Sequence, residues 1–393
     1  MKPIKYTKRI GHLFERVVDI DNLKEAIKNA AKHKMNRPSV QRVINDLDKY
    51  AGKLQEMLIT ESFRPHKYTG KLQEMLITES FRPHKYTIRE INDGIKKKKR
   101  IIAVPRFFPD QCVHHAFVQV FKEIVMHGAY EYSCGCVPGK GTDGARKIIE
   151  HWIAKDPAGT SKVAQIDVKQ CYPSIPHEEL RKKLEKKIKD RKFLRLAFKI
   201  IASYQQAMAT HTRMLPEIDA VGIPVGLYTS PWFLNFFFQD LDHKLKEVCG
   251  VRHLTRYVDD IILFDSSKKR LHAAIRYTSG WLNKVKMRIK DTWQVFHLRI
   301  RPLDFLGYKF HKGWTTLRKS VMYRISRKAK VISKKEYISK TNASGMISYM
   351  GFIDHSDSHG FYEKWIQPFV NIKLLKGVVS HENRKQYQTL CAA

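Results

Sequence analysis

The chain has 393 residues, with 73 Lys and Arg against 38 Asp and Glu, so its formal net charge is +35. Hydrophobic residues make up 43 % of the chain and aromatic residues 11 %, which excludes a disordered basic tail and provides for about two or three folded units. A folded protein with this charge is expected to act on a polyanion, with nucleic acid the first candidate and an acidic membrane surface the second.

The sequence does not indicate membrane insertion or secretion. No apolar run approaches the roughly 18 residues that a membrane span needs, and the N-terminal segment lacks the apolar core of a signal peptide. The six cysteines are scattered and do not form a disulfide framework. We therefore expect a protein of the reducing cytoplasm, without a membrane partner.

An 18-residue segment occurs twice in direct succession. Residues 52–69 read GKLQEMLITESFRPHKYT, and residues 70–87 repeat them without a change. Solenoid repeats diverge and come in threes or more, so one perfect duplicate indicates a recent or artificial duplication. Pro65 and Pro83 end any helix near the middle of each copy. We expect one copy to pack normally and the other to form a surface excursion.

The other elements follow one another without strict alternation of helix and strand. Helices are expected over residues 23–34, 40–50, 110–127, 178–199 and 232–248. The remaining signals are strand-like residues 101–105 and 163–168, a glycine-rich loop at 133–144, a turn at 222–231 and a hairpin at 252–264. This mixture favours an α+β fold over a doubly wound sheet.

Two adjacent acids, Asp259 and Asp260, lie between the halves of the expected hairpin. Such a pair is most often a solvated turn former, but a third acid changes the interpretation. Alternation along residues 163–168 puts the apolar side chains on one face, so Asp167 projects from the opposite face. Carboxylates on two neighbouring strands can hold two Mg²⁺ ions roughly 3.5–4 Å apart, which would activate a 3′-hydroxyl and stabilise a leaving pyrophosphate.

Four segments carry a resemblance to a known family. Residues 167–175 (DVKQCYPSI) resemble palm motif A of reverse transcriptases, 222–231 (GIPVGLYTSP) motif B, 257–260 (YVDD) motif C, and 303–310 (LDFLGYKF) the primer grip. In this order and spacing they make the sequence similar to prokaryotic reverse transcriptases of the group II intron-like lineage. The similarity extends over most of the chain. It implies a right-hand polymerase that copies RNA into DNA.

The resemblance implies roles for the residues around the acids. The catalytic set would be Asp167, Asp259, Asp260 and Lys290, and two Mg²⁺ ions, or Mn²⁺ in their place, would be bound by Asp167, Val168, Asp259 and Asp260. Lys290 would be the motif D lysine that protonates the pyrophosphate, although Arg288 lies nearby. Tyr172 would be the steric gate whose ring excludes a 2′-hydroxyl and so selects dNTPs. The alternative for Tyr172 is a buried core aromatic.

The resemblance also implies how nucleotide, template and primer are bound. Lys98 and Arg100 match the K-x-R pattern of the fingers and would clamp the triphosphate, with a solvated basic turn as the alternative. Val225 and Gly226 complete the nucleotide-binding set. Residues 309–335 contain ten Lys and Arg and no acid, which favours a thumb that grips the phosphates of an RNA/DNA duplex. The template and primer set is Ser230, Leu306, Gly307, Arg318, Lys319, Arg324, Arg327 and Lys328.

A zinc site is not expected from the cysteines and histidines. Cys112 with His115, and Cys134 with Cys136, form a C-x2-H and a C-x-C pair, but no second C-x2-C supports them. We interpret them as structural cysteines and a core histidine.

Within the family, the N-terminal layout and the residues 293–296 (WQVF) and 348–352 (SYMGF) look most like diversity-generating retroelement enzymes. Those enzymes copy a template RNA with adenine-directed errors and work with a small basic helical accessory protein. An aliphatic residue at Val225 fits them, whereas Ser230-Pro231 replaces their Ser-Gln. The alternative is an antiphage defence-associated enzyme with its own non-coding RNA. A non-catalytic RNA-binding scaffold is the alternative outside the enzymes.

The resemblance divides the chain into four parts. Residues 1–87 would be an N-terminal helical extension with the duplicated segment, 88–160 the fingers, 161–310 the palm with a helical fingers segment near 178–210, and 311–393 a basic helical thumb. The chain ends at Ala393 without an endonuclease or maturation domain, so a mobile intron protein is not expected.

Overall fold

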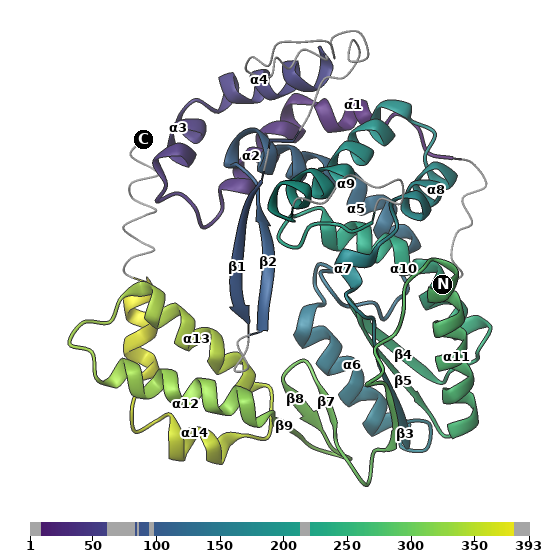
Figure 1. Cartoon of the computed structure of the whole chain (residues 1–393). Helices are drawn as coiled ribbons and strands as arrows, with labels where there is room; N and C mark the ends of the chain where they lie inside the picture. Colours follow the sequence, from purple (N-terminus) through teal and green to yellow (C-terminus); the bar gives the residue numbers. More distant parts are fainter. Residues whose placement is uncertain (1–8, 61–82, 85, 94–97, 213–220, 381–393) are drawn as a thin grey trace.

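The computed structural model describes residues 9–60, 83–84, 86–93, 98–212 and 221–380, the side chains of 92, 93, 98 and 204–212 excepted (Figure 1). Over these residues the chain combines helices with a two-stranded, a four-stranded and a three-stranded antiparallel sheet, which confirms the predicted α+β class. No helix in this part of the chain is long and apolar enough to span a membrane. The predicted surface excursion of the duplicated segment lies outside the described residues.

Short helices build the N-terminal part of the molecule. They are α1 (Leu13–Val18), α2 (Ile20–Ala31), α3 (Pro38–Asn45) and α4 (Leu47–Ile59), and α1 and α2 pack on α5 (Cys112–Gly128). Helix α2 begins earlier than expected because the Asp19 carboxylate accepts the backbone N–H groups of Asp21 and Asn22, at 3.0 and 3.1 Å. The single helix expected over 40–50 is divided at Asp46 into α3 and α4.

A long hairpin follows the N-terminal helices (Figure 1). Strands β1 (Thr87–Asp93) and β2 (Lys98–Val104) pair antiparallel, and the short segment η1 (Phe107–Gln111) leads from β2 into α5. The expected strand at 101–105 is thus part of β2, and the expected helix at 110–127 is α5. The N–H of Ala103 donates to the carbonyl of Val225 at 2.9 Å, so the hairpin is tied to the turn before α10 (Ser230–Glu247).

A four-stranded antiparallel sheet with the order β4-β5-β3-β6 forms the middle of the molecule. Its strands are β3 (Lys162–Asp167), β4 (His253–Tyr257), β5 (Asp260–Asp265) and β6 (Gln294–His297), so the predicted hairpin is β4–β5. Alternate residues of β3 and β5 belong to two hydrophobic clusters. One face of the sheet packs against α10 and α11 (Lys268–Lys284), and the other packs toward α6 (Gly141–Lys155) and the C-terminal elements.

The helix expected over 178–199 is two helices, α8 (His177–Lys187) and α9 (Arg191–Thr212). The division falls at Asp190, whose carboxylate accepts the N–H of Phe193 at 3.0 Å. The same carboxylate accepts the N–H groups of Leu13 and Phe14 at 2.8 Å each. One acidic side chain therefore begins both α9 and α1.

The C-terminal part joins a small sheet to three helices. These elements are β7 (Leu303–Phe305), β8 (Tyr308–Phe310), β9 (Thr315–Leu317), α12 (Lys319–Ser333), α13 (Lys340–Asp354) and α14 (His359–Trp365). Helix α12 buries Val321, Ile325, Ala329 and Ile332, a helical spacing that turns its basic residues outward.

Candidate active site

Three acidic side chains meet at one end of the central sheet. Asp167 ends β3 and Asp260 begins β5, and the two residues are directly paired in the antiparallel ladder, so their side chains lie on one face. Asp259 precedes Asp260 in the turn after β4, and its carbonyl accepts the N–H of Val168 at 3.2 Å. The fold thus brings together the three acids predicted from the sequence.

The surroundings of Asp259 and Asp260 oppose the ionisation of both carboxyl groups. Burial, and then the charge of Asp167, raises the pKa of Asp259 above its ordinary value. Burial and the charges of Asp259 and Asp167 raise the pKa of Asp260 to about 7. The Oδ1 atom of Asp167 is buried without a hydrogen-bond partner. Raised pKa values of this kind are typical of functional sites.

The donor atoms at this end of the sheet fit divalent metal ions. Among the described residues, no three His, Cys, Asp or Glu side chains form a metal-binding group by themselves. Mg²⁺ is usually held by one or two carboxylates together with water and substrate phosphates, so such a group is not required. Asp167, Asp259 and Asp260 supply hard oxygen donors. Val168 is fully buried and apolar, so only its carbonyl could contribute.

Lys290 lies against the acids. Its ammonium group forms an ion pair with Oδ2 of Asp167. Its backbone N–H also donates to the Asp167 carbonyl at 2.8 Å, and the N–H of Lys169 donates to the Arg288 carbonyl at 2.9 Å. The backbone around Lys290 therefore runs beside the end of β3, which places the Lys290 ammonium group next to the acids.

A cavity of about 1080 Å³ opens beside the acids. This volume slightly exceeds the usual range of small-molecule pockets, roughly 300–1,000 Å³. Its walls come from the loop between α2 and α3, β2, α5, residues 136–138, the segment of Tyr172, the turn before α10, the turn between β4 and β5, and the turn between β7 and β8. The predicted site residues in its lining are Arg100, Tyr172, Val225, Gly226, Ser230, Asp259, Asp260 and Leu306.

The turn before α10 leaves no room for a side chain at Gly226. Gly226 has a φ of 106°, and a Cβ atom there would lie 2.5 Å from Ile102 Cγ2 and 2.6 Å from the carbonyl oxygen of Ala103. Ser230 begins α10 and lines the cavity, and its buried hydroxyl has no hydrogen-bond partner. The cavity wall thus holds a polar group that a ligand could satisfy.

The predicted nucleotide-binding residues differ in what the structure describes. Tyr172, in the short helix α7 (Cys171–Ser174), is half-buried at the cavity wall, and its carbonyl accepts the N–H of Ile223 at 2.9 Å. Arg100 is exposed on β2 and lines the same cavity. The side chain of Lys98 lies outside the part of the chain that the structure describes.

The turn between β7 and β8 joins the cavity to the C-terminal helices. Leu306 and Gly307 both have positive φ, of 51° and 91°. The carbonyl of Gly307 accepts the N–H of Arg318 at 2.9 Å. A Cβ atom at Gly307 would lie 3.2 Å from Phe352 and 3.3 Å from Val321, so the turn packs tightly on α12 and α13.

The predicted duplex-binding cations, all described by the structure, lie on or next to α12 and outside the cavity lining. Arg318 forms an ion pair with Asp304 at 2.5 Å. Lys328 is half-buried, with its ammonium group 5.9 Å from the ring centre of Tyr349. Lys319, Arg324 and Arg327 are exposed.

Sequence analysis missed part of the cavity wall. Lys34 and Arg37, next to α2 and α3, belong to the lining. His115, expected in the core, is half-buried in the lining and stacks on Tyr228 with ring centroids 4.0 Å apart. Burial lowers the pKa of His115 to about 4, so its ring is neutral near pH 7. Two basic residues in the loop between α2 and α3 and one of two adjacent histidines carry no signal of such a position. Cys112 and Cys134, interpreted as structural, are buried, whereas Cys136, interpreted in the same way, is exposed and lines the cavity.

Comparison with known proteins identifies one family. The family described as "Reverse transcriptase (RNA-dependent DNA polymerase)" matches residues 71–310, which include the three acids. The "Uncharacterized 91 kDa protein in cob intron" of Schizosaccharomyces pombe is 32 % identical over 138 residues, 33 % of this chain and 16 % of that protein. The "Putative COX1/OXI3 intron 1 protein" of Saccharomyces cerevisiae is 26 % identical over 131 residues, 33 % of this chain and 14 % of that protein. The chain thus spans about a sixth of the length of these curated relatives.

Among solved structures, similar chains include two telomerases. The telomerase of Candida albicans in complex with the TWJ fragment of telomeric RNA is 11 % identical, covers 70 % of this chain and 54 % of its own, and has a TM-score of 0.45. The apo telomerase of Candida tropicalis is 12 % identical, covers 72 % and 53 %, and also has a TM-score of 0.45.

Proposed function

The chain belongs to the reverse transcriptase (RNA-dependent DNA polymerase) family and has its right-hand polymerase fold, and we propose that it extends a 3′-end with dNTPs on an RNA template. The observation that carries the proposal is the direct cross-strand pairing of Asp167 with Asp260, beside Asp259, at the wall of a large cavity. Nucleotidyl transfer needs hard oxygen ligands on rigid elements, and two strands of one sheet provide them.

We propose the following roles for the chain's own groups. Asp167, Asp259, Asp260 and the Val168 carbonyl would hold two Mg²⁺ ions, with Mn²⁺ as a substitute. When bound, the ions activate the attacking 3′-hydroxyl and stabilise the leaving pyrophosphate. Lys290 would deliver a proton to the pyrophosphate, a role that its contact with Asp167 supports.

The nucleotide and the nucleic acid would occupy the cavity and the adjoining basic helix. Arg100 and Lys98 would bind the triphosphate, and Tyr172, Val225 and Gly226 would surround the sugar and base. The unsatisfied hydroxyl of Ser230 supports template contact. Leu306 and Gly307 would contact the primer end. The duplex phosphates would be bound by the predicted cations, Arg318, Lys319, Arg324, Arg327 and Lys328. The boundaries proposed for the parts are 1–87, 88–160, 161–310 and 311–393.

For the biological role, we propose cDNA synthesis from a template RNA in a diversity-generating retroelement, in the cytoplasm and with a small basic helical accessory protein. The aliphatic Val225 in the cavity lining supports it, since a short side chain beside the nascent base pair holds that pair less firmly. Ser230-Pro231 favours the alternative, an antiphage defence-associated enzyme that works with its own non-coding RNA.

Primer extension on an RNA template tests the activity. We expect Mg²⁺-dependent extension with dNTPs that is lost in a double Asp259→Ala, Asp260→Ala variant. A double Asp21→Asn, Asp48→Asn variant removes the same charge from exposed residues outside the cavity and should retain it. Wild-type protein that extends no primer, even with cellular RNA added, would contradict the proposal and favour a scaffold. Sequencing of the product separates the roles, because errors concentrated at template adenines support the retroelement.

A further inference from the structure

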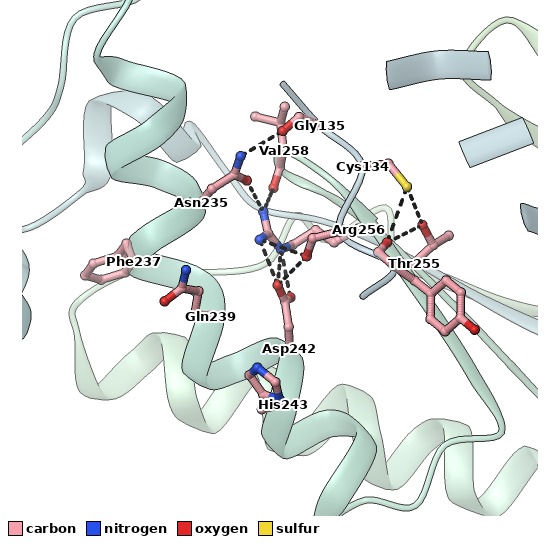
Figure 2. Close-up of polar contacts among 12 residues, drawn as sticks. Cys134, Gly135, Asn235, Phe237, Gln239, Asp242, His243, Thr255, Arg256 and Val258 are labelled. Atoms are coloured by element: carbon pink, nitrogen blue, oxygen red, sulfur yellow. Dashed lines mark hydrogen bonds and ion pairs between the residues drawn. The ribbon is translucent and has the colours of Figure 1, made fainter. Parts of the chain in front are cut away.

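A buried ion pair joins Arg256 to Asp242, two residues that Figure 2 shows close to Val258. Arg256, on β4, is 1 % exposed, and Asp242, on α10, is 0 % exposed. The Nε and Nη2 atoms of Arg256 each donate to the Asp242 carboxylate at 2.7 Å. Because desolvating two charges opposes folding unless every donor and acceptor is satisfied, such a pair is weak evidence of a purely stabilising role.

The remaining donors of Arg256 reach the turn and its neighbours. Its Nη1 donates to the carbonyl of Val258 at 2.9 Å and to the side-chain oxygen of Asn235 at 3.2 Å. Ser133 donates to the Asp242 carboxylate at 2.7 Å and accepts from Nη2 at 3.3 Å. The guanidinium group therefore links Val258 to α10 and to the segment around Ser133; Figure 2 shows its bonds to Val258, Asn235 and Asp242.

The turn needs such support because of its backbone. Val258 has a φ of 62°, in the left-handed region that β-branched residues rarely adopt. Gly135 packs closely against Val258: a Cβ atom at position 135 would lie 2.5 Å from the Val258 nitrogen. The carbonyl of Gly135 accepts the side-chain N–H of Asn235 at 2.8 Å. Strained backbone persists only where its surroundings over-determine it, and it is found at functional sites.

We propose that Arg256 is a positioning residue for metal binding. Arg256 does not line the cavity, but its bond to the Val258 carbonyl fixes the turn that carries Asp259 beside Asp260. The inference rests on the proposed function only in that these acids bind divalent metal. Metal binding to the protein, measured without nucleotide or nucleic acid, can therefore test it.

The decisive measurement is Mn²⁺ binding to the purified protein, followed by electron paramagnetic resonance. Arg256→Lys keeps a charge for Asp242, but an ammonium group does not reproduce the planar, multiple bonding of guanidinium. We expect this variant to bind Mn²⁺ about tenfold or more weakly, the range seen when residues that orient metal ligands are removed. The Mg²⁺ concentration for half-maximal extension should rise with it, while KM for dNTP stays near the wild-type value.

Two further variants separate positioning from stability. A double Arg256→Met, Asp242→Leu variant removes both buried charges, a change that often preserves stability, and it should still bind Mn²⁺ weakly. Asp265→Asn alters a fully buried acid at the far end of β5, which accepts the N–H of Ser267 at 2.8 Å. This control should lower Tm and leave Mn²⁺ affinity unchanged.

The outcomes distinguish this inference from the proposed function. Wild-type Mn²⁺ affinity in Arg256→Lys and in the double variant would overturn the positioning role. A wild-type protein that binds Mn²⁺, loses it in Arg256→Lys, but extends no primer would support the positioning role and contradict only the polymerase. A wild-type protein that binds no Mn²⁺ would contradict both.

Discussion

At the scale of single residues, the surroundings of Asp260 oppose the ionisation of its carboxyl group. Its pKa of about 7 lies above the ordinary 3.8, so the folded protein binds this proton more tightly than the unfolded chain does. The charged carboxylate therefore lowers the free energy of unfolding. This destabilisation is absent below about pH 4 and reaches its full size above pH 7.

Asp260→Asn should therefore stabilise the metal-free protein. In EDTA we expect the variant to have a higher Tm than the wild type at pH 8 and a smaller gain at pH 5, where the wild-type carboxyl is protonated in the folded state. Thermal melts at both pH values check this. Asp291→Asn, which removes an exposed carboxylate, serves as the control. An equal gain at pH 5 and pH 8 would show that relief of charge is not the cause.

Tyr172 carries the proposed choice between sugars. Its ring is half-buried at the cavity wall, where a ring beneath the nucleotide sugar would exclude a 2′-hydroxyl. We expect Tyr172→Ala to raise incorporation of rNTPs relative to dNTPs at least tenfold, which corresponds to about 1.4 kcal/mol. Tyr172→Phe keeps the ring and should keep the selectivity. Competing rNTP and dNTP in single-nucleotide extension measures the ratio, and an unchanged ratio in Tyr172→Ala would remove the steric-gate role.

At the scale of elements, the contact between β2 and the turn before α10 holds together two parts of the cavity wall. It consists of the bond from Ala103 to the Val225 carbonyl and of the close approach at Gly226. Because β2 carries Arg100, a displacement of the hairpin should move the proposed triphosphate contact away from the acids.

Gly226→Ala tests that coupling. The added Cβ would lie 2.5 Å from Ile102, and the φ of 106° is strained for any residue but glycine, so β2 must shift. We expect KM for dNTP to rise about tenfold, or about 1.4 kcal/mol. Gly280→Ala, in α11 with open space around its Cβ, should leave KM unchanged and slightly stabilise the protein. Steady-state extension kinetics decide, and equal KM values for both variants would contradict the coupling.

How much the sequence predicted depended on the kind of signal. Alternation predicted β3, and the apolar residues after Asp260 predicted the second strand of a hairpin, because both signals are set locally. The division between α8 and α9 was missed, although the bond from Phe193 to Asp190 is local; the bonds that the same carboxylate accepts from Leu13 and Phe14 depend on tertiary packing and leave no local signal. Arg256 gave no signal, because its burial depends on Asp242 of another element.

At the scale of the whole molecule, the cavity lies where segments far apart in the chain converge. Lys34 and Arg37 approach it from the N-terminal helices and Leu306 from beyond the central sheet. A net charge of +35 predicted a polyanionic partner. Which cations lie at the cavity and which lie on α12 follows from packing between distant elements, which composition and local pattern do not contain.

The duplicated segment offers a test of the molecule as a whole. The first copy supplies the end of α4, with Leu54 and Leu58 buried, and the second supplies Tyr86, which bonds Ser203 at 2.9 Å, and Thr87, which begins β1. Because the copies are identical, deleting residues 52–69 leaves one copy that contains both parts in full. Its first residues can complete α4, and its last residues can enter β1.

We therefore expect the deletion of residues 52–69 to change Tm by less than about 3 °C, or about 1 kcal/mol, and to leave primer extension at the wild-type level. Leu54→Ala in the undeleted chain shows that the assay responds, since loss of a fully buried leucine costs about 2–5 kcal/mol. Thermal melts and extension assays on the three proteins give the comparison. A deletion variant that unfolds as readily as Leu54→Ala would mean that one copy cannot supply both the end of α4 and the start of β1.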